Sequence, residues 1–178
     1  MASNKIFDRF IKGYGGTFES YGFAISELNR RFERCPNQGH DSSTRDFIWS
    51  LFQELVLKAG QQAKTEYDLY KGQWIIYAKM LDYRRRMEKS KANEILQLQL
   101  KAYIQMSSLE SRLSLKCVVI SGRCCEFCDS LNEKEYNIAE VLDKQFLGSK
   151  NCTNDRGCNC SYSLIPERGL DGSFISIK

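Results

Sequence analysis

The sequence predicts a mainly α-helical protein, with a small antiparallel helical bundle over residues 1–113 and a small α+β module of the zinc-binding type over residues 114–178. Apolar residues recur at three- and four-residue steps through most of the first part, which is typical of amphipathic helices. A β-branched run at residues 115–121 then indicates a strand. Seven of the eight cysteines lie between residues 117 and 160, so the two parts also differ in chemistry.

Composition places the chain among globular proteins. It has 178 residues, 42% of them hydrophobic and 27% charged, which is enough to bury a core and argues against disorder. Charged residues interrupt the first ten positions, and no stretch reaches the ~18 apolar residues of a membrane span. We therefore expect a cytoplasmic protein that does not engage a membrane.

Four helical tracts with short connections are expected in the first part, as in a small bundle. The first has an apolar face from Phe18 to Phe32 and stops before Pro36. The other three are expected over about 43–59, 67–86 and 92–112.

Shorter elements are expected in the second part. The strand at 115–121 is closed by Gly122. A helix over 138–146 follows Asn137, with Glu140 placed for a reciprocal capping pattern. A second strand is expected over 162–165, and residues 173–178 are expected to form an edge strand or a tail.

The cysteines of the second part have the spacing of a metal site. In a reducing compartment, clustered thiols are more often metal ligands or catalytic groups than structural bridges. A Cys-x-x-Cys turn brings two sulfurs to one tetrahedral ion, and a second pair completes a closed, structural shell. We expect one zinc ion bound by four of five cysteines, which are Cys125, Cys128, Cys152, Cys158 and Cys160.

Within this group the preferred ligands are Cys125, Cys128, Cys152 and Cys160. Cys158 is the substitute, because residues two apart on an extended strand point in opposite directions unless the chain kinks. Cys124 could replace Cys125 with a longer spacing.

Other interpretations of the cysteines are weaker but stay open. Iron–sulfur clusters use the same thiolates, whereas a thioredoxin-like pair would lie at the start of a helix, and here the expected helix begins about ten residues later. Cys117 is expected to be a small buried apolar residue of its strand. Cys35 and His40 are spaced so that they could bind a metal, but a single histidine in a polar loop is usually only solvated.

The cysteine module, residues 117–166, resembles the C-terminal end of the phage Mu F-like head morphogenesis family. The resemblance lies in the segments Cys125–Tyr136 and Cys152–Tyr162. It implies a phage or prophage protein with a zinc-type module, found in the host cytoplasm or in the virion. Family members often have a histidine before the terminal pair, whereas this chain has Leu147–Asn151 there, so any metal must depend on cysteines.

A basic segment at residues 79–91 is the candidate for binding a partner or nucleic acid. Cations at the end of a helix also interact favourably with the helix dipole, so a solvated helix end is the simplest explanation of the pattern. Phosphates or an acidic protein surface are the alternatives. The six basic residues are Lys79, Arg84, Arg85, Arg86, Lys89 and Lys91.

No catalytic motif stands out. The chain has one histidine, and Gly13–Gly16 lacks the lysine of a phosphate-binding loop. We therefore expect a non-catalytic, zinc-stabilised binding or scaffold protein that engages another protein. A nucleic-acid-binding protein is the alternative, and a thiol redox enzyme or hydrolase comes third.

Overall fold

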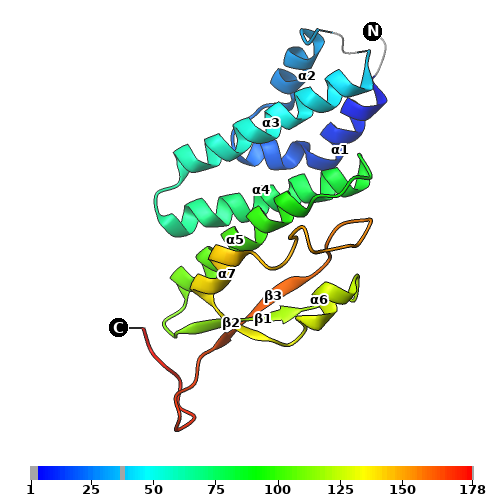
Figure 1. The fold of residues 1–178 in the computed structure, drawn as a ribbon. Coiled ribbons are helices and arrows are strands. Elements are labelled where there is room, and N and C mark those ends of the chain that lie inside the picture. Colours follow the sequence, from blue (N-terminus) through cyan, green and yellow to red (C-terminus); the bar gives the residue numbers. More distant parts are fainter. Residues whose placement is uncertain (1–3, 37–38, 178) are drawn as a thin grey trace. The chain divides into compact units, whose positions relative to one another are not determined.

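The computed structural model describes residues 4–36 and 39–177 (Figure 1). It is mainly helical, with a small three-stranded antiparallel sheet in the C-terminal part, which confirms the predicted fold class. Residues 1–3 lie outside the described residues, as does Lys178 of the expected tail. Among the helices that the structure describes, none has the length and apolar character needed to cross a membrane.

Two compact units make up the chain, residues 1–63 and residues 64–178. The helices predicted over 67–86 and 92–112 fall in the unit that contains the cysteines, while the division into domains at 113/114 stays a prediction. Helical periodicity shows which face of a segment is apolar, but not which neighbour covers it.

The first unit contains α1 (Lys5–Ser20), α2 (Ile25–Glu33) and α3 (Asp41–Gln62). The single helix predicted across residues 18–32 is therefore wrong, since α1 ends at Ser20 and α2 begins at Ile25. Between them Gly22 has a φ of +87°, a conformation that glycine adopts at little cost and that ends a helix. Aromatic side chains fill the core of this unit, with the ring of Phe7 stacked on that of Phe32 at 4.1 Å.

The second unit begins with α4 (Glu66–Arg86) and α5 (Asn93–Glu110), close to the predicted ranges. Helix α4 starts with a capping box, in which the backbone N–H of Asp68 donates to Thr65 Oγ1 at 3.1 Å. In return, the backbone N–H of Thr65 donates to a carboxylate oxygen of Asp68 at 3.1 Å. These bonds satisfy donors that the first turn of a helix leaves without partners.

The sheet has the order β2-β1-β3. It consists of β1 (Leu115–Ile120), β2 (Glu135–Asn137) and β3 (Ser161–Pro166), and β1 pairs antiparallel with both neighbours. The short helices α6 (Glu126–Ser130) and α7 (Ile138–Lys144) lie between strands in the sequence. Helix α7 begins where predicted, although the side chain of Asn137 makes no capping bond, and it ends at Lys144 because Gln145 is left-handed.

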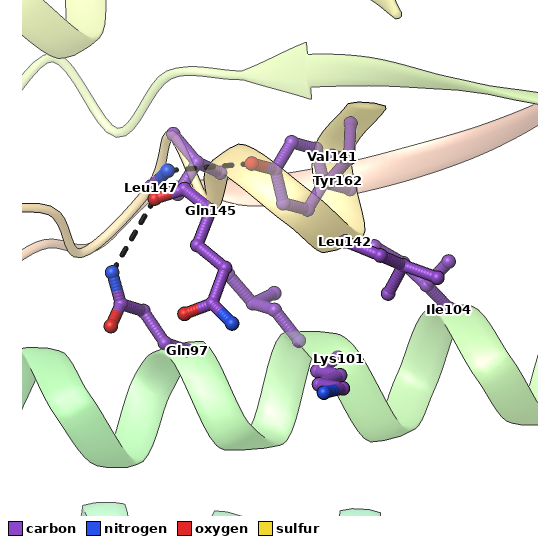
Figure 2. Close-up of a pocket in the computed structure, with 9 residues that line it drawn as sticks. Gln97, Lys101, Ile104, Val141, Leu142, Gln145, Leu147 and Tyr162 are labelled. Carbon is purple, nitrogen blue, oxygen red and sulfur yellow. Dashed lines mark hydrogen bonds between the residues drawn. The ribbon is translucent and has the colours of Figure 1, made fainter. Parts of the chain in front are cut away.

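One apolar core joins α5, the sheet and α7. Figure 2 shows how the turn after α7 is held in this region. The backbone N–H of Leu147 donates to the hydroxyl of Tyr162 at 3.3 Å, and the amide of Gln97 on α5 donates to the carbonyl of Gln145 at 3.4 Å. The same turn leads into the cysteine-rich segment, so these bonds fix the start of that segment against α5 and β3.

Replacing Thr65 by alanine tests the capping box. Loss of the side-chain acceptor should lower the free energy of unfolding of the second unit by about 1 kcal/mol, whereas Thr65→Ser should keep most of it. The measurement is urea denaturation followed by Trp74 fluorescence in a Trp49→Phe background, because Trp49 and Trp74 are the two tryptophans and lie in different units. Equal stability of the alanine and serine variants would contradict the role of the cap.

Candidate metal centre

Pairing of β1 with β3 brings two distant cysteine segments together. The end of β1 faces the start of β3, since Ile120 pairs with Ser161. The loop that follows β1 therefore meets the loop that precedes β3. The first loop and α6 carry Cys124, Cys125 and Cys128, and the second loop carries Cys152, Cys158 and Cys160.

The distances between sulfurs match those of ligands around one ion. The Sγ atoms lie 3.7 Å apart in the Cys124–Cys160 pair, 3.8 Å in Cys125–Cys152 and 3.7 Å in Cys128–Cys158. A disulfide needs about 2.05 Å, and all the cysteines are free thiols. Four sulfurs about 2.3 Å from a zinc ion at tetrahedral angles lie about 3.8 Å from one another.

Two groups of four sulfurs are close enough together to hold a metal ion. Within each group all four Sγ atoms lie within 4.8 Å of one another. One group is Cys124, Cys125, Cys128 and Cys152, and the other is Cys124, Cys128, Cys158 and Cys160. Cys124 and Cys128 therefore belong to both.

The preferred set of four ligands is not one of these groups. Cys152 lies in the first and Cys160 in the second, while Cys124, which was outside the five expected ligands, lies in both. The sequence-based prediction assumes one ion with four ligands, and it therefore treats the additional cysteines as substitutes for one another. Cys158 and Cys160 share a group because the chain is not yet a strand at these positions and Gly157 bends it with a φ of +87°.

The six cysteines of the two groups are largely shielded from solvent. Cys128 and Cys158 are fully buried, Cys152 and Cys160 are nearly so, and Cys124 and Cys125 are half-buried. The four buried cysteines are part of the same apolar core as α5 and the sheet. Thiolates buried in this way are characteristic of closed structural metal sites, which leave no coordination position for a substrate.

Backbone N–H groups point at the sulfurs. The N–H of Gly122 donates to Cys160 Sγ at 3.3 Å, and that of Cys128 donates to Cys125 Sγ at 3.5 Å. Hydrogen bonds of this kind stabilise the charged thiolate. Further backbone donors to the group are Asn159 to Cys124, Thr153 to Cys125, Asn154 to Cys152, and Gly148 and Cys160 to Cys158.

These environments divide the thiols by their tendency to ionise. Burial acts to raise the pKa of Cys125, but hydrogen bonds from the N–H groups of Cys128 and Thr153 and from the thiols of Cys128 and Cys152 together outweigh it and bring the value to about 6. Burial instead dominates at Cys158, raising its pKa to about 12, and it raises the pKa of Cys128 strongly. Ionising the buried thiols requires nearby positive charge, which a divalent ion would supply while releasing their protons.

Arg85 of α4, one of the predicted basic residues, lies beside the sulfurs. Its guanidinium donates a hydrogen bond to the carbonyl of Cys158. Burial lowers the pKa of Arg85, while the nearby Cys158, Asp82 and Cys124 act to raise it. Arg85 thus brings one positive charge to the side of the cluster formed by Cys158 and Cys124.

The other residues of the basic segment have different surroundings. On α4, Arg84 pairs with Glu88 and Arg86 with Asp82, each at 2.6 Å. Lys79 is also on α4 and is half-buried. Lys89 and Lys91 are exposed in the connection to α5, and Lys91 Nζ lies 3.8 Å from a carboxylate oxygen of Asp155.

Asn93, at the start of α5, was not identified from the sequence. Its side-chain oxygen accepts the backbone N–H of Cys158 at 2.9 Å. This contact spans 65 positions and depends on how α5 packs, so no local motif could have indicated it.

The remaining candidates belong to neither group of sulfurs. Cys117 is fully buried in β1 and belongs to neither group, and burial raises its pKa to about 11. Cys35 and His40 are in the first unit and also belong to neither group.

Comparison with known proteins returned no match to a family model, a curated protein or a solved structure. The resemblance to the phage Mu F-like family therefore stays a prediction.

Replacing Asn93 by alanine tests its contact with the cysteine segment. The N–H of Cys158 would lose its partner in a partly buried site, which should lower the free energy of unfolding of the second unit by about 1 to 3 kcal/mol. Asn93→Asp keeps the acceptor oxygen and serves as the control. Denaturation followed by Trp74 fluorescence measures both variants, and equal losses would show that the acceptor oxygen is unimportant.

Proposed function

We propose that this protein is a non-catalytic, zinc-stabilised scaffold that binds another protein. The observation that carries the proposal is the gathering of six cysteine sulfurs at the spacing of metal ligands inside the core of the second unit. Soft thiolates in a tetrahedral arrangement favour zinc or an iron–sulfur cluster, and four thiolates without an open position are typical of structural zinc.

A structural role follows from where the cysteines lie. The core that includes Cys128, Cys152, Cys158 and Cys160 also includes apolar side chains of α5, β1 and α7. An ion that fixes the sulfurs therefore fixes the packing of the surrounding helices and strands. Metal-binding free energy then contributes directly to folding, as it does in small zinc modules.

The segment after β3 supports a protein partner. It carries four large apolar side chains, Leu170, Phe174, Ile175 and Ile177, each at least 39% exposed. Exposed apolar groups that lie close together are characteristic of interaction sites. On the Mu F-like resemblance we further propose a phage or prophage protein, located in the host cytoplasm or the virion.

The surroundings of the basic residues favour this function over nucleic-acid binding. Arg84 and Arg86 are in ion pairs along α4, and Arg85 donates to the carbonyl of Cys158. Phosphate contacts would compete with these interactions.

Chelation of the metal should unfold the second unit and leave the first folded. The two tryptophans separate the units, because a Trp49→Phe variant reports through Trp74 and a Trp74→Phe variant reports through Trp49. After excess chelator, Trp74 emission should shift to longer wavelength, and Trp49 emission should stay unchanged. Readdition of zinc should restore the Trp74 signal.

The metal content of the purified chain is measured alongside the fluorescence. The proposal would be contradicted by a reduced, metal-free protein whose Trp74 emission does not change on addition of chelator or of zinc. Stoichiometric iron, together with the visible absorption of an iron–sulfur cluster, would show that the cysteines bind such a cluster instead of zinc.

A further inference from the structure

We propose that the six cysteines hold two zinc ions in one cluster, with Cys124 and Cys128 each bridging both ions. This inference rests on the proposed zinc-binding function and adds the number of ions and the role of each sulfur. Cys125 and Cys152 complete the shell of the first ion, and Cys158 and Cys160 complete that of the second.

We infer two ions because the two groups of sulfurs have two members in common. The two groups together contain six cysteines and have Cys124 and Cys128 in common. Two tetrahedral ions need eight ligand positions, and six thiolates fill them when two of the six are used twice. Each of the six sulfurs then binds at least one ion, and only Cys124 and Cys128 bind two.

A single ion leaves two sulfurs without a role. If it occupied the first group, Cys158 and Cys160 would be buried thiols, although they lie 3.7 Å from Cys128 and Cys124 respectively. If it occupied the second, Cys125 and Cys152 would remain as a 3.8 Å pair. In both cases the unused sulfurs already have the spacing of adjacent ligands, from the two shared sulfurs in the first case and from each other in the second.

The positions of the two shared sulfurs suit bridging. Cys128 is fully buried and interacts with Cys125 of the first group and with Cys158 and Cys160 of the second. Cys124 interacts with Cys160 and with Cys125. A thiolate has three lone pairs, so Cys124 can bind two ions and still accept the N–H of Asn159.

Charge balance also favours a second ion. Six thiolates with two divalent ions have a net charge of about −2, whereas one ion would leave about −4 if all six were ionised. The guanidinium of Arg85, bonded to the carbonyl of Cys158, offsets part of the remaining charge. Backbone N–H groups directed at Cys160 and Cys125 stabilise more of it.

Metal stoichiometry of the full chain is the first test. Elemental analysis after removal of loosely bound metal should give two zinc ions per chain. One ion per chain would overturn the binuclear cluster and leave the zinc scaffold standing, whereas no zinc would overturn both.

Cadmium-113 NMR of the cadmium-exchanged chain tests the bridges directly. Two resonances of equal intensity should appear, each split by coupling to the other, because a shared sulfur connects the two nuclei. A single resonance, or two resonances without mutual splitting, would overturn the bridging arrangement.

Single substitutions distinguish the two ions. Cys152→Ala removes a ligand of the first ion only and Cys160→Ala a ligand of the second only, so each should lower the content from two ions to one. Cys117→Ala is the matched control, because Cys117 is buried in the same core but lies in neither group, and it should keep two. Unchanged content in Cys160→Ala would overturn the second ion, even if Cys152→Ala failed to fold.

Discussion

Crowding of six thiol sulfurs in one core is the constraint on which the second unit depends. Sulfurs at 3.7 to 3.8 Å repel one another once they are ionised, and burial at Cys128 and Cys158 makes ionisation costly without nearby positive charge. Metal ions reverse this balance, because each thiolate then contacts a divalent cation. The packing that is unfavourable for thiolates alone is thus the packing that a metal–thiolate cluster requires.

The rest of the unit serves to hold the two cysteine segments in place. Register between β1 and β3 sets Ile120 opposite Ser161, which brings the loops together. From the helices, Asn93 accepts the N–H of Cys158 and Arg85 donates to its carbonyl. Strand pairing thus determines which segments meet, and the two helical side chains determine how the second segment lies.

Periodicity and residue type predicted most elements of the fold, including α4, α5 and the strands β1 and β3 to within a few residues. They missed the break at Gly22, where a stripe of apolar residues continues although the backbone turns. Spacing also predicted that cysteines would form a metal site, and the structure brings the five candidates together. It could not reveal that Cys124 belongs to both groups or that Asn93 supports the segment, because both depend on contacts between distant residues.

The most direct measurement of the central claim is zinc X-ray absorption of the purified full-length chain. Its extended fine structure should show four sulfur neighbours for each zinc at about 2.3 Å and no nitrogen or oxygen neighbour. Nitrogen or oxygen ligands at about 2.0 to 2.1 Å, or fewer than four sulfurs, would contradict a closed cysteine site.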